Sequence, residues 1–534
     1  MVPQSQRLRR TIRRVSAAAL LGCALASRAA AQRDWAPEER AVLGDFTRIN
    51  AVAATMQKVY AVGADAVIGW DPLARKWEGP WLPREPGSLT DVFAAVADPL
   101  DNSLWLIRPN GWLRFDPTIR TWEQGFVAGR VTDAALDQNA PAGGLFLRTS
   151  AGWYTALRGG AAMPSAAPQR PVRLGSVDQA IRSNPAIQAN SAGLLFTSRF
   201  RNIRYTSAVR ASGFAGQGWY LGTTGAGLVY FPDGSGRPVP MPFGLPGEAA
   251  DAVFAGNGGV WVVNERTNSA DPGLTFVAKD LSDLRWFQGP RANGLPFAQA
   301  RRMVGRGSAL WLATDVGAVA ITPKDEEIER YDMGRGLPDS RVYDLAQRKG
   351  RLVAATAHGL AEYSDSAGFQ RIAPDFSDVA LAVELSGDTT WVGTRIGLFA
   401  VLPGKADLLQ PDAMAGALSF QTPVVDLAWR GDTLVALTQD RLIWRDPGSG
   451  RFTLGPMLGS GFGRLHTVVN GRDALYLAGD KGVSAVRLGA PVTRLLTAPG
   501  DLPGDITGLA VDDDYLWVST LRGLVRFQLD LVGR

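Results

Sequence analysis

The clearest pattern in the sequence is an apolar segment that recurs with a polar turn and a second apolar segment behind it. It is found in WYLGTTGAGLVYF (219–231), LWLATDVGAVAI (310–321), LVAATAHGLAEY (352–363), TWVGTRIGLFAV (390–401) and LWVSTLRGLVRF (516–527). In most copies a Thr, two variable residues and a Gly separate the two apolar segments. Runs of about five β-prone residues joined by a Gly-containing turn are typical of paired strands. The pattern therefore predicts repeated β-hairpins.

Weaker copies extend the series to eleven units, at 59–70, 104–115, 145–155, 260–267, 434–445 and 475–486. Successive apolar anchors lie 38 to 50 residues apart, except for one interval of 73. A period in this range is typical of the four-stranded blade of a β-propeller. The anchors are Tyr60, Trp105, Phe146, Trp219, Trp261, Trp311, Val353, Trp391, Val435, Tyr476 and Trp517. The Trp anchors are expected to pack between blades, because apolar neighbours lie two residues away.

The predicted fold class is all-β: a β-propeller of about eleven four-stranded repeat units. Eleven units exceed the usual four to eight blades of a ring, so two toroids or one unusually large ring are expected. We divide the chain into a signal peptide (1–31), divergent propeller repeats (32–158), an insert or linker (159–210) and regular propeller repeats (211–534). The insert contains a stretch, Ser176 to Gln188, that favours a short helix. A degenerate twelfth unit hidden there would give rings of four and eight.

The units resemble the two-component-regulator propeller repeat. The sequence GLP precedes the first strand at 244–246, 294–296 and 336–338, and WVGT (391–394) and Gly-Leu pairs follow in the expected places. The resemblance is close over 219–534 and loose over 41–158. It implies a propeller, often the periplasmic sensor half of a hybrid histidine kinase. Here neither a kinase nor a transmembrane segment is recognisable, and only seven residues follow Phe527.

The N-terminus has the features of an export signal. Five arginines between Arg7 and Arg14 precede the apolar run 15–26, and Ala29-x-Ala31 has the spacing of a signal-peptidase site. An apolar run this short does not span a bilayer, which needs about 20 residues. We expect a periplasmic or secreted protein. Alternatively, Leu20 to Cys23 form a lipobox, and Cys23 carries a lipid anchor.

Charge and cysteine content exclude several classes of function. The chain has 56 basic and 51 acidic residues, but residues 1–31 contain six arginines and no acid. The remainder is close to neutral, with 50 basic and 51 acidic residues. It lacks the concentrated basic surface of a nucleic-acid-binding protein. Cys23 is the only cysteine, so a processed chain would have neither a disulfide nor a thiol nucleophile.

No catalytic or metal-binding motif stands out, and we predict no catalytic residues, no metal and no cofactor. His358 and His466 are the only histidines, which leaves little for a catalytic triad or a His-rich metal site. No nucleophile elbow, phosphate-binding loop or EF-hand loop is present. Acidic residues are numerous, however, so a glycosidase with two carboxylates stays an alternative.

Strand parity predicts where a ligand would bind. Because strands alternate in direction, the loop before strand one and the turn between strands two and three lie on one face of the ring. The variable positions of those turns give five candidate ligand-binding residues: Asp315, His358, Arg395, Lys481 and Arg522. Such rings of polar groups suit a polar ligand or a protein segment.

These features favour an exported, non-catalytic propeller that binds a ligand or a partner in the cell envelope, either a protein or a glycan. One alternative is an enzyme acting on a polysaccharide or lactone at the channel mouth. Another is the sensory partner of a separate membrane kinase. An acid pair facing the channel would favour the enzyme.

Overall fold

The computed structural model describes residues 35–532, apart from 37, 86, 138–143, 157–161, 170, 190–202, 214–216, 235–236, 257, 267–268, 288–294, 403–404, 408–421 and 493–494. The expected signal peptide, including Cys23, lies outside the described residues.

The described chain folds into eleven antiparallel sheets, ten of four strands and one of five. Every anchor of the repeat lies on the second strand of its own sheet, from Tyr60 on β3 to Trp517 on β44. Each repeat unit is therefore one blade, and the predicted all-β propeller is confirmed. The expected insert adds no further four-stranded sheet among its described residues, so a twelfth blade is not seen.

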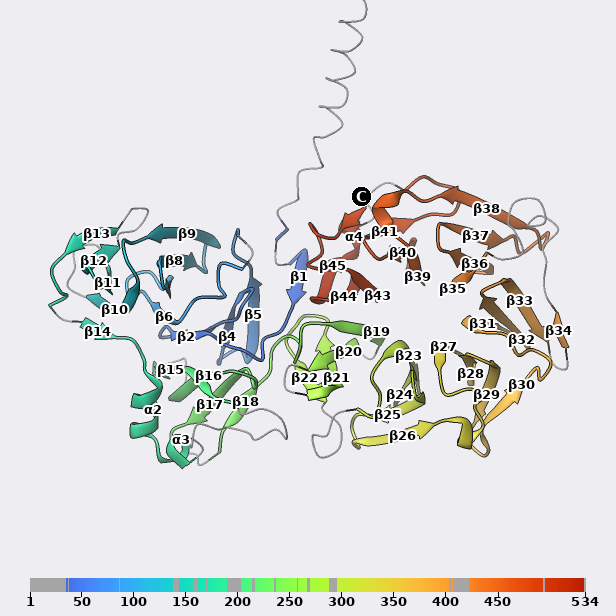
Figure 1. Ribbon diagram of the computed structural model, residues 1–534, viewed down its shortest axis with the longest axis horizontal. Coiled ribbons are helices and arrows are strands. Elements are labelled where there is room, and N and C mark those ends of the chain that lie inside the picture. Colours follow the sequence, from blue (N-terminus) through green and yellow to red (C-terminus); the bar gives the residue numbers. More distant parts are fainter. Residues whose placement is uncertain are drawn as a thin grey trace, which may run out of the picture.

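Four sheets form a smaller ring, on the left in Figure 1. In each sheet four consecutive strands lie side by side in sequence order. The first blade has β2 (Ala51–Ala54), β3 (Val59–Val62), β4 (Val67–Asp71) and β5 (Lys76–Trp81), and the second has β6 (Ala94–Ala97), β7 (Leu104–Arg108), β8 (Gly111–Asp116) and β9 (Thr121–Phe126). The third has β10 (Val131–Asp137), β11 (Leu145–Thr149), β12 (Gly152–Ala156) and β13 (Ala162–Ser165), and the fourth has β15 (Tyr205–Ala211), β16 (Gly218–Thr223), β17 (Leu228–Pro232) and β18 (Val239–Met241).

The range expected as an insert, 159–210, includes β13 of the third blade and most of β15 of the fourth, and the rest of its described residues connect these two blades. Its strand β14 (Pro171–Arg173) adds to the inner edge of the third sheet, next to β10. The stretch for which a short helix is expected holds α2 (Val177–Ser183) and α3 (Pro185–Ala189). The Ser176 hydroxyl caps α2 by accepting a hydrogen bond from Gln179 N. Ala180 and Ile187 are buried against Trp219 of the fourth blade, so the helices fill the space beside this blade.

The larger ring has seven blades. Six of them are β19 (Ala250–Gly256), β20 (Gly259–Arg266), β21 (Ser269–Ala278), β22 (Leu284–Phe287); β23 (Ala300–Arg306), β24 (Ala309–Thr314), β25 (Gly317–Thr322), β26 (Glu327–Tyr331); β27 (Val342–Arg348), β28 (Arg351–Thr356), β29 (Gly359–Ser364), β30 (Gly368–Ile372); β31 (Ala380–Ser386), β32 (Thr389–Thr394), β33 (Gly397–Leu402), β34 (Lys405–Asp407); β35 (Val424–Arg430), β36 (Thr433–Thr438), β37 (Arg441–Arg445), β38 (Phe452–Met457); β39 (Leu465–Asn470), β40 (Leu475–Gly479), β41 (Gly482–Val486), β42 (Leu496–Thr497).

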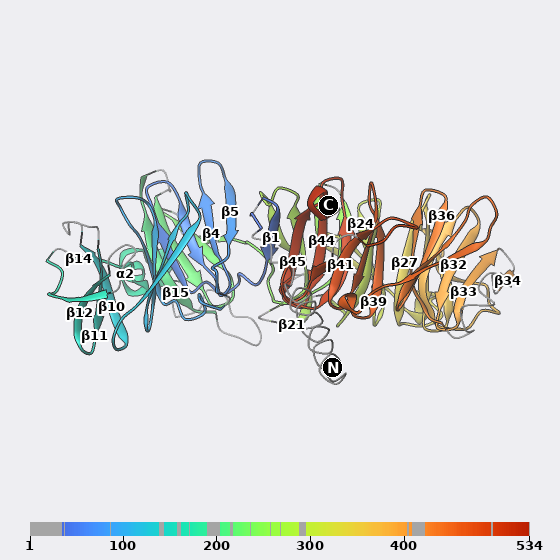
Figure 2. The same ribbon diagram turned by 90° about the horizontal axis from the view of Figure 1, so that it is seen from above.

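The seventh blade closes the larger ring with strands from both ends of the sequence. It contains β43 (Ile506–Val511), β44 (Tyr515–Thr520) and β45 (Gly523–Gln528), followed by α4 (Leu529–Val532). Its outermost strand is β1 (Arg40–Leu43), which pairs antiparallel with β45. In the sequence, the smaller ring is therefore inserted between β1, which closes the larger ring, and the remaining strands of the larger ring. The two rings lie edge to edge (Figure 2).

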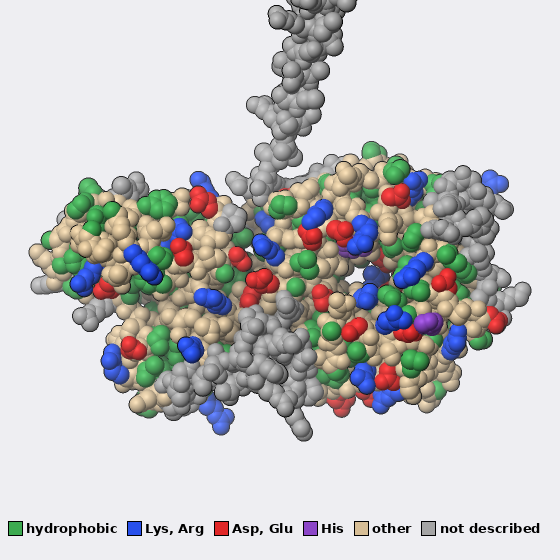
Figure 3. Space-filling view, in the orientation of Figure 1, with side chains coloured by type: hydrophobic (Ala, Val, Ile, Leu, Met, Phe, Trp, Pro, Cys, Tyr) green, Lys and Arg blue, Asp and Glu red, His purple; other side chains and the backbone are tan. Residues whose placement is uncertain are grey.

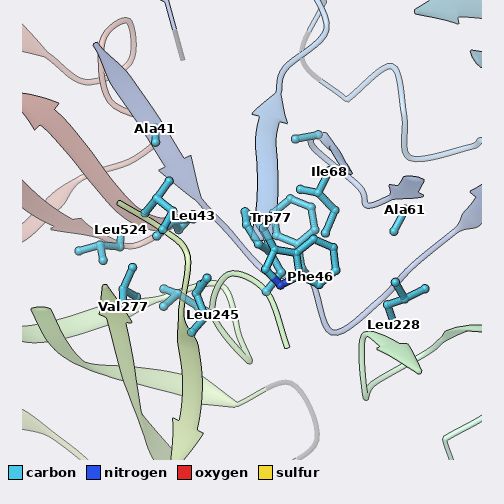
Figure 4. Packing of buried hydrophobic residues seen from close by; sticks show 14 of the residues in the cluster. Ala41, Leu43, Phe46, Ala61, Ile68, Trp77, Leu228, Leu245, Val277 and Leu524 are labelled. Carbon is cyan, nitrogen blue, oxygen red and sulfur yellow. The ribbon is translucent and has the colours of Figure 1, made fainter. Parts of the chain in front are cut away.

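The two chain segments that connect the rings, one after β1 and one after β18, are hydrogen-bonded to each other and pack in a shared core. Asp45 and Leu245 form a parallel bridge, and Leu245 N donates to Gly44 O at 2.9 Å. Phe46 and Phe243 meet edge to face at 5.0 Å, with Trp77 5.3 Å from Phe243. Phe46 and Trp77 lie close together in this cluster (Figure 4). The junction therefore buries the aromatic rings of Phe46, Phe243 and Trp77.

The recurring Thr and Gly have the structural roles that their turn requires. The Thr314 hydroxyl donates to Gly317 O at 2.6 Å and accepts from Val316 N at 3.3 Å. Gly317 has a φ of 136°, where side chains are disfavoured. The expected packing of the Trp anchors between blades is seen for Trp311, which is 3% exposed and lies in one apolar cluster with Leu352 and Phe369 of the next blade. Trp219 differs, because it packs against the helices α2 and α3.

Candidate binding site at the mouth of the larger ring

The innermost strands of the larger ring share an irregularity close to their first residue. In all seven, the pairing register with the second strand shifts, which leaves at least one residue outside the ladder as a β-bulge. A bulge re-aims the side chain that it carries. Here the re-aimed residues are Asp251, Arg301, Tyr343, Leu381, Val425, His466 and Thr507, and all seven line one cavity.

This cavity lies at the mouth of the central channel and has a volume of about 670 Å³. That volume is in the range of small-molecule sites. Lys and Arg side chains, with Asp and Glu side chains among them, surround the opening (Figure 3). The turns between strands two and three are tied to the same rim, because Asp315 N donates to Gln299 O and Leu521 N to Asp505 O.

Two buried carboxylates at the bulges connect neighbouring blades. Asp344 accepts from Leu345 N at 2.8 Å and from Val383 N of the next blade at 2.8 Å. Asp426 likewise accepts from Leu427 N at 2.9 Å and from Val468 of the following blade at 2.7 Å. Each carboxylate thereby accepts from a backbone N–H of the adjacent innermost strand. That N–H faces the channel, where no further strand pairs with it, so it would otherwise have no partner.

One arginine links these carboxylates across the channel. Arg302 lies 3.2 Å from Asp344 and 3.6 Å from Asp426. Burial raises the pKa of Asp344 to about 6 and that of Glu384 to about 7, although Arg302 acts in the opposite direction on both. Burial also raises the pKa of Asp426. The attraction of Asp426 raises the pKa of Arg302, so this guanidinium stays charged.

The outer part of the cavity is polar and cationic. Arg301 is exposed, with its guanidinium 4.7 Å from the Tyr343 ring centre. The side chain of Arg464 is 66% exposed and lies 3.8 Å from Asp480. His466 bonds through Nδ1 to the Thr467 hydroxyl at 2.9 Å, while Nε2 has no hydrogen-bond partner among the described residues. Burial lowers the pKa of His466, which favours the neutral ring.

The five residues predicted from the turns lie on the rim, and none belongs to the cavity lining. Asp315 accepts from Ala298 N and Gln299 N, both at 3.1 Å. His358 Nδ1 lies 2.8 Å from Asp339, and Lys481 forms an ion pair with Asp505. Arg395 and Arg522 are exposed. The turns thus surround the opening, and the binding role of these five residues stays a prediction.

Sequence reasoning missed the residues that line the cavity. The bulged residues and their neighbours occupy the second and third positions of each first strand, as in ARR (300–302), VYD (342–344) and VVD (424–426). The signal that could have found them is a polar or charged residue repeated at this position, a few residues after a GLP turn. Strand alternation alone would place every second residue between blades, because it does not include the bulge.

The described residues contain no group of three or more His, Cys, Asp or Glu side chains that could hold a metal ion. Asp512, in the acidic run 512–514, instead accepts from Asp514 N, Tyr515 N and Trp517 Nε1 and so shapes its turn. Within the part of the chain that the structure describes, no helix is long and apolar enough to span a membrane.

Fold and site together define a double β-propeller with a polar cavity at the mouth of its seven-bladed ring. No family model and no curated protein sequence matches the chain. Among solved structures, PorZ is similar: it is described as an essential bacterial surface component of the type-IX secretion system of Porphyromonas gingivalis. The two chains are 13% identical, with a TM-score of 0.50 over 92% of this chain and 87% of PorZ. This similarity shows the fold.

Two further solved structures have lower TM-scores. The extracellular domain of BT4673 from B. thetaiotaomicron, a putative one-component system, is 15% identical with a TM-score of 0.42. The match covers 91% of this chain, which spans 65% of that domain's chain. Virginiamycin B lyase from Staphylococcus aureus is 13% identical with a TM-score of 0.43, over 53% of this chain and 95% of the lyase.

Proposed function

We propose that this protein is an exported, non-catalytic binding platform of the cell envelope, whose ligand or partner enters the mouth of the larger ring. One observation carries the proposal: seven blades each turn a bulged residue into the same cavity. A ring of side chains converging on one opening is the arrangement that a binding site requires. The export signal expected at residues 1–31 supports a location in the periplasm or outside the cell.

The buried charges support a structural rather than a catalytic use of the channel. Asp344 and Asp426 each accept two backbone hydrogen bonds and share Arg302. These contacts hold neighbouring blades together. Arg301, Arg395 and Arg522 at the mouth are exposed and form no ion pair with another described residue, so they are available to a ligand.

A second candidate is supported by the same carboxylates. Asp344 and Asp426 form an acid pair that lines the channel cavity, and burial raises both pKa values. Such a pair is typical of enzymes that need one protonated and one ionised carboxyl group. The test is hydrolysis or elimination of polysaccharide and lactone substrates by the wild type and by Asp426→Asn. Turnover that this substitution abolishes, while the fold is retained, would establish the enzyme and contradict the binding platform.

The platform is tested by thermal shift with glycans, metal ions and cell-envelope fractions. A ligand that binds only the folded protein, at a concentration well above its Kd, stabilises it by about one to two kcal/mol or more. We expect such a shift in the wild type and its loss in a variant with Arg301→Ala and Tyr343→Ala.

The matched control is Arg285→Ala, on the outermost strand β22, where the side chain is 62% exposed. This variant should shift like the wild type. A shift that persists unchanged in the mouth variant would place the site elsewhere.

A further inference from the structure

We infer that the mouth of the larger ring recognises an acidic peptide segment with interspersed apolar side chains, presented by a partner protein. The inference rests on the proposed binding function and specifies the chemistry of its ligand.

The first support is a set of unpaired arginines on the lip, by which we mean the rim turns and the outer wall of the cavity. Arg301, Arg395 and Arg522 form no ion pair with any other described residue, and all three are exposed. The carboxylates around them are already engaged. Asp339 bonds to Arg341 and His358, and Asp505 bonds to Lys481. Arginine forks bind carboxylates bidentately, so several anionic side chains in a row would complement this lip.

The second support is apolar surface next to these cations. Ile396 is 43% exposed and Leu521 is 50% exposed, and each is the neighbour of an unpaired arginine. The cavity wall adds Leu381, Val425 and Ile506. A ligand that alternates carboxylates with apolar side chains would satisfy both kinds of surface, because apolar burial adds to the ionic contacts.

The third support distinguishes a peptide from an acidic polysaccharide. Sugar rings stack on exposed aromatic faces, but Tyr343 is the single aromatic side chain among the residues that line the cavity, His466 apart. Arg301 already covers one face of that ring at 4.7 Å. The apolar contacts on the lip come from aliphatic side chains, which suit aliphatic peptide residues.

The paired charges lie deep in the channel and the unpaired arginines lie at the opening, so a carboxylate of the ligand would bind at the lip. The deep guanidinium of Arg302 is neutralised by Asp344 and Asp426. A carboxylate would therefore be repelled from Asp344 and Asp426 and held by the exposed arginines of the lip, which are the unpaired Arg301, Arg395 and Arg522 and also Arg464, 3.8 Å from Asp480. The peptide would then lie across the opening and place single apolar side chains into the cavity.

The experiment is fluorescence anisotropy on the processed full chain with three labelled peptides of one length. One alternates Glu and Leu, one has Gln for every Glu, and one has Ser for every Leu. We expect the Glu/Leu peptide to bind, each altered peptide to bind at least about tenfold more weakly, and affinity to fall with salt.

The variants are Arg301→Ala with Arg464→Ala and, as a charge-matched control, Arg285→Ala with Arg330→Ala on outermost strands. The mouth variant should bind about tenfold more weakly or worse, and the control should bind like the wild type. The double variant Arg301→Lys with Arg464→Lys keeps the charge and should recover part of the affinity, which separates recognition from misfolding.

Three results would overturn the inference. Equal binding of the Glu and Gln peptides would remove the role of charge, and equal binding by mouth and control variants would move the site. Binding of oligogalacturonate at the mouth, without binding of the Glu/Leu peptide, would identify an acidic glycan and leave the platform intact. If the thermal-shift test places every ligand elsewhere, the proposed function itself fails.

Discussion

At the scale of single residues, the larger ring depends on charges that are buried and shared. Asp344 and Asp426 each bridge two blades through backbone N–H groups, and Arg302 lies between the two carboxylates. Removing one member of such a buried set leaves donors and a guanidinium without partners. The loss therefore costs much more than an exposed ion pair does.

Asp426→Ala is expected to destabilise the protein by about 3 kcal/mol, because Leu427 N, Val468 N and Arg302 all lose a partner. Urea denaturation of both forms measures the change. Asp375→Ala, at an exposed carboxylate, is the control and should change little. Equal stability of wild type and Asp426→Ala would show that the bridge is dispensable.

Glu384 makes stability depend on pH. Its pKa lies near 4.5 in the unfolded chain and about 7 in the folded protein, because burial disfavours the charged form. Between these values the folded state binds the extra proton, so this group's contribution to stability falls as pH rises from about 4.5 to 7. Asp344 contributes in the same direction.

Glu384→Gln should reduce this dependence. Relative to the wild type, the variant should gain about 1 kcal/mol or more when pH is raised from 5 to 8. Chemical denaturation at both pH values measures the difference between the two proteins, which cancels the contribution of other groups. A difference that does not change with pH would show that Glu384 titrates normally.

At the scale of elements, the repeat pattern predicts the strands well and the site poorly. Tyr60, Trp311 and the other anchors lie on second strands as the spacing indicates, because local β propensity and turn chemistry determine these hairpins. The bulges at Arg301 and His466 depend on pairing with a neighbouring strand and on closure of the ring. The sequence carries only a weak signal for them, a polar or charged residue a few residues after a GLP turn, so the pattern indicates the rim turns and not the cavity lining.

Gly317 tests how strictly the recurring turn requires glycine. A Cβ there would lie 2.1 Å from Tyr331 O, and the φ of 136° adds strain. Gly317→Ala should cost about 3 kcal/mol. Gly350→Ala, with a φ of 86° and no atom within 4 Å of its Cβ, carries only the backbone strain and should cost about 1 kcal/mol. Equal losses of stability would show that the close approach to Tyr331 is unimportant.

At the scale of the whole molecule, the chain builds four and seven blades from eleven similar units. The sequence predicts two rings or one large ring, but the division falls after β18, within the regular repeats rather than at the insert. Ring closure explains this. Strand β1 completes the seventh blade, so the smaller ring must begin and end at the same edge of the larger one. Such long-range pairing leaves no mark on local sequence.

Removal of residues 32–44 should open the larger ring while leaving the smaller ring's own sheets complete. Leu43, fully buried beside Leu524, would be lost with β1, and the edge of β45 would be exposed. Calorimetry should then show a transition at lower temperature, and limited proteolysis should first cut residues 245–532. An unchanged melting profile would show that the β1 closure contributes nothing to stability.

The most direct test of binding at the mouth is photo-crosslinking with the Glu/Leu peptide carrying a benzophenone, followed by mass spectrometry. Binding at the mouth predicts adducts on the lip and cavity wall, at Arg301, Tyr343, Ile396, Val425 and Leu521 and their neighbours. The unlabelled peptide should compete for these adducts. Adducts confined to the smaller ring, to the outermost strands or to the opposite face of the larger ring would contradict it.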